Sequence, residues 1–170
     1  MKKLLILGAG GYGKTVADVA AQLGYETVAF LDDGQTGSHI LGKCEEFFRF
    51  CNENTQIYPA FGNNAVRMQW LKTLMDAGAE VPVLVHPRAY VSPTAVLETG
   101  TVVLPMAVVN TGVRVQMGCI VNIGALIDHD SIIEEGVHLA PGAVVKAENR
   151  IPAGCKIESG QVIENRQYPL

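Results

Sequence analysis

The 170-residue sequence has no long apolar runs, no blocks of like charge and few aromatic side chains. No stretch approaches the roughly 20 apolar residues that a transmembrane helix needs, so we expect no membrane span. Thirteen basic and 17 acidic residues give a net charge of −4 without a run of either sign, which argues against a nucleic-acid partner. Aromatic residues make up only 6% of the chain, so Val, Ile, Leu and Ala must fill the core.

Cysteine is also sparse and unpatterned. The four cysteines contain no CxxC pair and show no metal-like spacing with the four histidines. We therefore expect reduced thiols and no metal site at Cys44, Cys51, Cys119 and Cys155. The apolar run Leu4–Leu7 leads into a Gly-rich segment without an evident signal-peptide cleavage site, which predicts a cytoplasmic protein.

The first 84 residues alternate between strand-like and helix-like segments. Short apolar runs predict strands over residues 4–7, 27–31, 57–61 and 81–85. Helical spacing predicts helices over residues 16–23, around residues 45–50, and from Asn63-Asn64 to Gly78. Because Pro59 has no backbone N–H, the third strand is expected at an edge or where that donor is not needed. This order of elements predicts a small, parallel, Rossmann-like α/β domain over residues 1–84.

A period of six governs the rest of the chain. Every sixth residue from Val85 to Ile163 is aliphatic, and the residue four positions later is usually small. All eight glycines beyond residue 99 stand three positions after an aliphatic residue. Short strands with inward aliphatic residues, joined by corners where glycine supplies a positive φ, form a parallel β-helix with three hexads per coil. The period predicts this fold over residues 85–170 but leaves its handedness open.

A Gly-rich loop follows the first strand. Gly8-x-Gly10-x-x-Gly13, with Asp32 some 20 residues on, fits a loop whose backbone N–H groups approach a phosphate while the acid takes ribose hydroxyls. Taken alone the motif is weak, because it also fits a nicotinamide-dinucleotide fingerprint or a tight turn without a ligand. The predicted sheet is too small for two mononucleotide halves, so a nicotinamide enzyme ranks last.

Several motifs, in order along nearly the whole chain, resemble one known family. They are Leu7-Gly-Ala-Gly-Gly-Tyr-Gly13, Asp32-Asp33, Phe61-Gly-Asn-Asn-Ala-Val-Arg67, His86-Pro87, and Asn122 through Asp128-His129-Asp130 to His138-Leu-Ala-Pro-Gly142. The sequence is similar to the bacterial sialic-acid O-acetyltransferases and UDP-amino-sugar N-acetyltransferases. The resemblance implies a left-handed β-helix, acetyl-CoA as acyl donor, a UDP-sugar or related glycan precursor as acceptor, and a homotrimer.

His129 is the expected catalytic base. Three ionisable residues, Asp128, His129 and Asp130, stand together at one corner of an otherwise bland repeat, and Asp130 occupies a glycine place. The alternative is a solvated, charged corner without a function. In the functional interpretation, neutral His129 takes the proton of the acceptor's amine or hydroxyl, and Asp130 holds the imidazole in the right tautomer.

The resemblance also implies binding residues. It assigns acetyl-CoA binding to His138, to Asn122 and to a backbone N–H near Ala147 that would act as the oxyanion donor. His138 fits a surface histidine beside a turn equally well, and Asn122 and Asn110, two hexads apart, could instead be stacked polar groups. For the nucleotide sugar, the resemblance implies these residues: Gly8, Gly10, Gly11, Tyr12, Gly13, Asp32, Asp33 and Asn63.

Three departures from the family pattern carry expectations of their own. Tyr12 stands where family members usually have His, so its contact to the sugar or phosphate is expected to differ. Glu148 and Asn149 occupy a glycine place and a small-residue place, which predicts a bulge or a skipped corner. Family members typically continue for two further coils, so we expect a shortened coenzyme A region. The alternative function is therefore a non-catalytic or altered-activity member of the family that binds sugar nucleotides.

Overall fold

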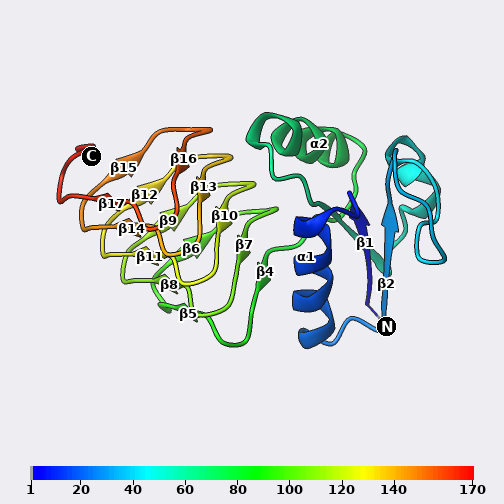
Figure 1. Ribbon diagram of the computed structural model, residues 1–170, viewed down its shortest axis with the longest axis horizontal. Helices are drawn as coiled ribbons and strands as arrows, with labels where there is room; N and C mark the ends of the chain where they lie inside the picture. The colour runs from blue at the N-terminus through cyan, green and yellow to red at the C-terminus, as the bar shows by residue number, and fades with distance from the viewer. Residues whose placement is uncertain (1) are drawn as a thin grey trace. The chain divides into compact units, whose positions relative to one another are not determined.

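The computed structural model describes residues 2–170, which form two compact units. The first unit ends at Pro82, and the second runs from Val83 to Leu170. Figure 1 shows helices and a small sheet in the first unit and stacked coils in the second. No helix within the described residues is long and apolar enough to span a membrane.

The first unit is built on a three-stranded parallel sheet with the strand order β2-β1-β3. Its strands are β1 (Lys3–Leu7), β2 (Thr27–Leu31) and β3 (Thr55–Pro59). The helices are α1 (Gly11–Gln22), the 3-10 helix η1 (Cys44–Phe50) and α2 (Asn64–Asp76). Because β1 lies at the centre, the chain passes from β1 to β2 on one side and then crosses to β3 on the other. The carboxyl ends of β1 and β3 therefore form the switch point at which open α/β sheets bind ligands.

The predicted fourth strand of this sheet, residues 81–85, is wrong. Only Glu80 forms an isolated bridge with Gln56, and its carbonyl accepts the Ile57 N–H at 2.9 Å. Pro82 cannot donate a ladder hydrogen bond, and Leu84–Val85 (β4) pairs with β7 of the second unit instead. The edge position expected for the third strand is confirmed, because β3 has β1 as its one neighbour in the sheet.

The second unit is a left-handed parallel β-helix made of fourteen two-residue strands. The first sheet contains β4 (Leu84–Val85), β7 (Val102–Val103), β10 (Ile120–Val121), β13 (His138–Leu139) and β16 (Lys156–Ile157). The second sheet contains β5 (Tyr90–Val91), β8 (Val108–Val109), β11 (Leu126–Ile127), β14 (Val144–Val145) and β17 (Val162–Ile163). The third sheet contains β6 (Val96–Leu97), β9 (Arg114–Val115), β12 (Ile132–Ile133) and β15 (Arg150–Ile151). Paired strands are 18 residues apart, as three hexads per coil require.

Aliphatic side chains fill the β-helix, as the low aromatic content predicts. Val109, Ile127 and Val145 point inward from the second sheet, and all are buried. Small residues such as Ala125 and Ala143, from the places four positions after an aliphatic residue, lie in the same cluster. Because short aliphatic side chains fill the interior, polar side chains are found mainly at the corners.

Left-handed backbone conformations mark the corners. The eight glycines beyond residue 99 have φ between 65° and 73°. Four other residues adopt positive φ, and each stands in a glycine place: Met106, Asp130, Glu148 and Arg166, with φ of 62°, 57°, 57° and 55°. The bulge expected at Glu148 is therefore wrong, because Glu148 simply takes the glycine conformation and β12 pairs with β15 in the regular register.

Asn149 fits the small-residue place because its polar atoms are all satisfied. Its side chain is fully buried, and its amide donates to the carbonyls of Lys146 and Glu164, both at 2.8 Å. Its Oδ1 accepts the Tyr168 N–H at 2.9 Å. Buried polar groups are tolerated when they are hydrogen-bonded, so the last coil continues without a skipped corner.

Candidate active site

One corner of the β-helix carries most of the predicted chemistry. We call the turns between the second and third sheets the His129 corner, which comprises residues 92–95, 110–113, 128–131, 146–149 and 164–167. His129 follows β11, and its Nδ1 lies 2.9 Å from Asp130 Oδ2. Because a carboxylate only accepts hydrogen bonds, Nδ1 carries the proton and donates it. The lone pair of Nε2 is then left to accept a proton in the neutral imidazole.

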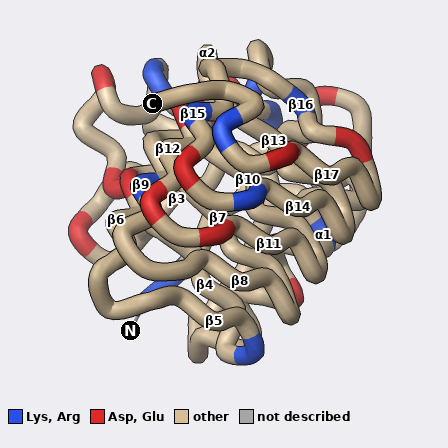
Figure 2. Tube along the Cα trace, turned by 90° about the vertical axis from the view of Figure 1, so that its left-hand side faces the viewer, with Lys and Arg blue, Asp and Glu red and all other residues tan. Residues whose placement is uncertain are grey.

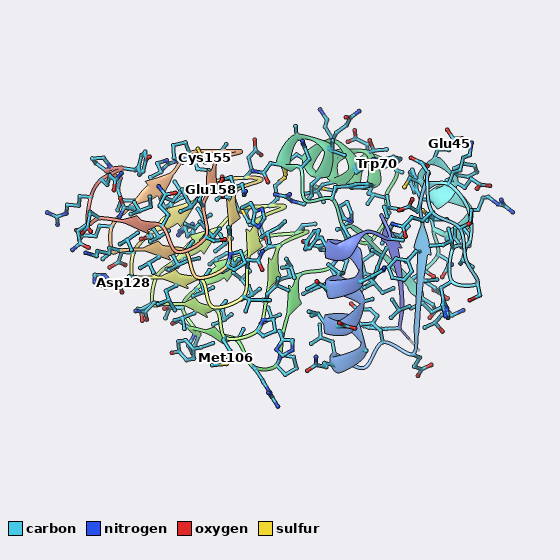
Figure 3. The ribbon with its side chains drawn as sticks, viewed as in Figure 1. Glu45, Trp70, Met106, Asp128, Cys155 and Glu158 are labelled. Carbon is cyan, nitrogen blue, oxygen red and sulfur yellow. The ribbon has the colours of Figure 1, made fainter. Side chains whose placement is uncertain are left out.

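Asp128 and Asn110 hold the backbone of His129 in place. Asp128 Oδ1 accepts the His129 N–H at 2.7 Å and the Asn110 amide at 3.0 Å. Asn110 belongs to the preceding coil, and its own Oδ1 accepts the Thr111 N–H at 2.8 Å. Figure 3 labels Asp128 at the edge of the β-helix. His129 therefore sits on a turn that hydrogen bonds from two coils hold in place.

The surroundings of His129 favour its protonated form. The pKa of His129 is raised, chiefly by the hydrogen bond to Asp130 and further by the negative charges of Asp128, Asp130 and Glu148. The side chains of His129 and Asp130 are 49% and 61% exposed, so both reach solvent. Asp128 has a lowered pKa because its carboxylate accepts the His129 backbone N–H. This arrangement suits a group that takes up a proton during a reaction.

Ala147 lies one coil beyond His129 on the same corner. Thr111 and His129, in the same place of the two preceding coils, donate their N–H groups to Asn110 and Asp128. Lys146 precedes Ala147 as Asn110 and Asp128 precede Thr111 and His129, but the lysine side chain has no acceptor atom. Within residues 2–170, the Ala147 N–H donates none of the hydrogen bonds that the structure shows. A donor without a partner therefore lies one coil beyond His129, where stacked strands are about 4.8 Å apart.

A second polar pair lies on a different edge. Asn122 Nδ2 is 3.0 Å from His138 Nε2, and Asn122 Oδ1 accepts the Ile123 N–H at 2.8 Å. Since the amide oxygen is used by a backbone donor, the NH₂ group donates to His138, whose Nε2 acts as acceptor. Asn122 stands where the first sheet turns into the second, and His138 is on β13 of the first sheet. The second sheet therefore separates this pair from the His129 corner within one chain.

The outer surface of the second sheet is apolar. Its strands contain no charged residue, and the outward side chains of Tyr90, Leu126 and Val162 are 54%, 41% and 45% exposed. Figure 2 shows strands β8, β11 and β14 without charge, with acidic and basic residues gathered at turns. A groove of about 260 Å³ lies here, with Val108, Leu126 and Val144 on its apolar side and Asn110 and Asp128 at its polar end.

The Gly-rich loop of the first unit is shaped by close contacts on one side and open on the other. Gly8 has φ of 95°, and a Cβ at Gly13 would collide with the Gly8 carbonyl oxygen. Gly10 and Gly11 have open space beside them. Gly10 is the N-cap of α1, and neither a side-chain cap nor an acidic residue occupies the first turn. The loop thus presents a helix N-terminus that favours an anion.

Tyr12 turns inward from this loop. Its hydroxyl lies 3.0 Å from the hydroxyl of Tyr58, which is fully buried on β3. Burial and the neighbouring Tyr58 raise the pKa of Tyr12 well above its usual value, so it stays neutral. The buried Arg67 donates to the Phe61 carbonyl at 2.9 Å and to Asn64 Oδ1 at 2.8 Å. The sequence did not single out Tyr58, because nothing in its strand marks it as a partner.

Asp32 and Asp33 hold backbone N–H groups at the end of β2. Asp32 Oδ2 accepts the Ala9 N–H at 2.7 Å, and Oδ1 accepts those of Gly34 and Gln35. These bonds lower the pKa of Asp32, with the Ala9 bond contributing most. Asp33 accepts the Cys44 N–H at 2.9 Å. Both acids line a cleft of about 430 Å³, so a ribose contact by Asp32 stays a prediction, while its anchoring role is observed.

Asn63 serves as the N-cap of α2. Its Oδ1 accepts the Val66 N–H at 3.1 Å, which confirms the helix start that the sequence predicts. Asn63 lies four residues beyond the end of β3 (Thr55–Pro59), which is parallel to β1, the strand that the Gly-rich loop follows. Within the described part of the chain, no group of three His, Cys, Asp or Glu residues could hold a metal ion.

The comparisons with known proteins agree with the fold of both units. Residues 3–74 match the family model described as the PglD N-terminal domain. The acetyltransferase domain of PglB from Neisseria gonorrhoeae FA1090 has a TM-score of 0.95 and 38% identity, over 98% of this chain and 84% of that chain. That domain has also been solved in complex with acetyl coenzyme A, with a TM-score of 0.94.

Two further proteins are similar over part or all of the chain. UDP-N-acetylbacillosamine N-acetyltransferase from Bacillus subtilis (strain 168) is 31% identical over 112 residues. The match covers 61% of this chain and 52% of that protein, so this chain spans about half the length of the curated relative. PerB from Caulobacter crescentus, solved with CoA and GDP-perosamine, has a TM-score of 0.86 at 22% identity, over 97% of this chain and 90% of that chain. At this identity the likeness shows the fold alone.

The Rossmann-like unit and the hexapeptide β-helix together define a class of acyltransferase scaffold. The chain belongs to the family of sialic-acid O-acetyltransferases and UDP-amino-sugar N-acetyltransferases, which join these two units. The resemblance inferred from the sequence motifs is thereby confirmed.

Proposed function

We propose that this protein transfers an acetyl group from acetyl-CoA to the amino group of a UDP-linked amino sugar in glycan biosynthesis. One observation carries the proposal: the His129–Asp130 pair and the unpartnered Ala147 N–H lie on one corner, one coil apart. Nitrogen is favoured over oxygen as the acceptor, and UDP as the nucleotide, because the curated relative is named an N-acetyltransferase for UDP-N-acetylbacillosamine.

His129 would act as the general base. Its Nδ1–H is held by Asp130, so Nε2 is the atom that takes a proton from the acceptor amine. Asp130 then stabilises the imidazolium. Because the pKa of His129 is raised, the base is neutral, and therefore competent, only above that raised pKa.

The Ala147 N–H would stabilise the negative charge that develops on the acyl oxygen. A backbone donor that is not engaged elsewhere costs no reorganisation when the charge forms. Its neighbours in the preceding coils are capped by side chains, which sets Ala147 apart from them. The oxyanion role that the family resemblance implies for Ala147 is supported by this difference.

The groove beside Asp128 has the chemistry that the acyl donor needs. Its apolar side, formed by residues such as Val108 and Leu126, suits the pantetheine chain, and its polar end leads to the His129 corner. Acetyl-CoA, when bound, supplies the acetyl thioester. Asn122 and His138 would bind the donor, with the Asn122 amide fixing the ring orientation of His138.

The nucleotide sugar would bind at the carboxyl ends of β1–β3. Gly10, Gly11 and the N-terminus of α1 suit its phosphates, and the cleft lined by Asp32 and Asp33 suits its nucleoside. Gly8 and Gly13 shape the loop, and Tyr12 and Asn63 would complete the site. The hydroxyl of Tyr12 is neutral and lies against the buried Tyr58, so Tyr12 brings no charge to the sugar.

We further propose that the protein assembles as a cytoplasmic homotrimer. The second sheet presents exposed apolar side chains, which assembly would cover. His129 and His138 lie on different edges of one β-helix, so a site that uses both residues needs two copies of the chain. Within residues 2–170 none of the four cysteines forms a disulfide, and the cytoplasmic location that the sequence predicts is part of this proposal.

The test is a thiol-release assay with acetyl-CoA and a panel of UDP-linked amino sugars, preceded by calorimetric titration of each ligand. We expect both ligands to bind and free coenzyme A to appear with at least one amino sugar, at one equivalent per acetylated amine. Binding of UDP-sugars without acetyl-CoA binding or thiol release would contradict the proposal. That result would identify a non-catalytic sugar-nucleotide-binding protein.

A further inference from the structure

Three residues with unfavourable backbone conformations are stacked on the His129 corner. Asp130, Glu148 and Arg166 stand 18 residues apart, in successive coils, with φ of 57°, 57° and 55°. Gly112 holds the same place in the coil before them, with φ of 70°. The left-handed conformation costs a non-glycine residue roughly 1–2 kcal/mol. Such strain is typically retained where the side chains have a function.

Hydrogen bonds link His129 to Asp130 and to Glu148, and link Glu148 to Arg166. Asp130 receives the His129 Nδ1–H, and Glu148 donates its backbone N–H to the His129 carbonyl at 3.1 Å. Glu148 Oε2 forms an ion pair with Arg166 Nε. A Cβ at Gly112 would come within 2.5 Å of Asp130 Oδ1, so glycine is retained in the preceding coil, where a side chain would displace Asp130. The residue in this place therefore changes from glycine at position 112 to a charged residue at position 130, in the coil that carries His129.

We propose that Glu148 is a positioning residue whose carboxylate, held by Arg166, stabilises the imidazolium that forms when His129 takes a proton. The proposal rests on the function proposed above for His129. Asp130 makes the direct hydrogen bond, and Glu148 adds a second negative charge from the next coil. Arg166 fixes the Glu148 side chain and keeps it ionised.

The charges around His129 support this assignment. Asp128 and Asp130 on its own turn and Glu148 on the next coil all raise the pKa of His129, with Asp130 acting most strongly. Arg166 lowers the pKa of Glu148 through their hydrogen bond. From the preceding coil, the facing residue is the uncharged Asn110. The remaining charges on the corner, Lys146 and Glu164, are paired with each other.

The experiment measures the titration of His129 directly. The C2–H proton of His129 is followed by NMR in the full-length protein between about pH 5 and pH 9, and its signal is identified by its loss in His129→Ala. Glu148→Gln removes the charge and keeps the size. Glu148→Gly removes the charge and also relieves the backbone strain. Glu164→Gln is the matched control, because it neutralises a carboxylate on the same corner that does not act on His129.

We expect the titration midpoint of His129 to move to lower pH in both Glu148 variants and to stay in place in Glu164→Gln. The movement should shrink in 1 M salt, which screens exposed charges. Glu148→Gly should be at least as stable as the wild type, so a lower midpoint in this variant cannot be ascribed to unfolding. An unchanged midpoint in both Glu148 variants, or an equal movement in Glu164→Gln, would overturn the proposal.

A kinetic measurement separates this proposal from the function on which it rests. In the Glu148 variants, the acid limb of the pH profile of kcat/KM should move to lower pH together with the NMR midpoint. If the midpoint moves and the profile does not, Glu148 acts on His129 but His129 is not the base. That outcome overturns the positioning role of Glu148 in catalysis and the assignment of His129 as the base, while acetyl transfer and the charge interaction both stand.

Discussion

Asp130 accepts the Nδ1–H of His129 at 2.9 Å from a backbone position with φ of 57°, in a place where most hexads of the β-helix have glycine. The left-handed conformation turns the carboxylate back towards the preceding side chain. A glycine at this place would relieve strain but would leave the imidazole without an acceptor. The chain therefore gives up local stability to fix the tautomer of one histidine.

Replacing Asp130 should shift the pH dependence of the reaction. Asp130 raises the pKa of His129, so Asp130→Asn should lower it and move the acid limb of the kcat/KM profile to lower pH. The maximal rate should fall, because the imidazolium loses its counter-charge. The measurement is kcat/KM for the acceptor from about pH 5 to pH 9. Asp130→Gly, which removes the strain as well, should show the same displacement, and an unmoved acid limb in both variants would refute the pairing.

Proline at position 147 should remove the oxyanion donor without disturbing the coil. Pro87, Pro93, Pro105 and Pro141 occupy the equivalent place in other hexads, so the fold accepts proline there. Ala147→Pro should lower kcat about 100- to 1,000-fold, the effect of losing one oxyanion donor, with little change in acetyl-CoA affinity. Ser159→Pro, at the same place on another corner, is the control and should keep wild-type turnover. Equal turnover in Ala147→Pro would show that this N–H takes no part in the reaction.

Asp32 should stabilise the first unit at neutral pH but not in acid. Asp32→Asn replaces one acceptor by an NH₂ group that cannot bond to the backbone N–H groups, which costs about 1–3 kcal/mol of unfolding free energy. The pKa of Asp32 is lowered in the folded protein, so its contribution is full above the unfolded-state pKa and is lost as pH falls through the folded-state value. Urea unfolding can be followed by the fluorescence of Trp70, the single tryptophan of the chain.

The matched control for Asp32 is Asp18→Asn, an exposed carboxylate on α1. It should leave the unfolding free energy within about 0.5 kcal/mol of the wild type. Equal stability of Asp32→Asn and Asp18→Asn at pH 7 would contradict the anchoring of Ala9 and Gly34. A deficit in Asp32→Asn that persisted unchanged at acid pH would contradict the ionised form as its cause.

The sequence predicts the β-helix well because the fold repeats one local rule. An aliphatic residue in every sixth place fixes which side chains point inward, and the glycines fix the corners. The rule fails at Glu148 and Asn149. The corner needs a positive φ and a side chain that can be buried there, and residues other than glycine or a small residue can meet these needs. Glu148 meets the requirement with φ of 57°, and Asn149 fits because Lys146, Glu164 and Tyr168 satisfy its side chain.

Other features depend on partners that periodicity cannot identify. Leu84 and Val85 have the apolar character of a Rossmann strand, but their hydrogen bonds go to the β-helix. Glu148 and His129 are 19 positions apart in the sequence. Their contact can be recognised only when it is known which residues of successive coils lie next to each other. The free N–H of Ala147 becomes evident only when the side chains that cap its counterparts, Asn110 and Asp128, are placed. The motifs near His129 could be read from the sequence; the contacts that tune it could not.

The most direct test of the account is the rate of acetyl transfer by His129→Ala at saturating acetyl-CoA and UDP-linked amino sugar. Loss of a general base should lower kcat about 100- to 10,000-fold, while the calorimetric affinity for acetyl-CoA stays within a few-fold of the wild type. Turnover by His129→Ala within about threefold of the wild-type value would contradict the assignment of His129 as the base.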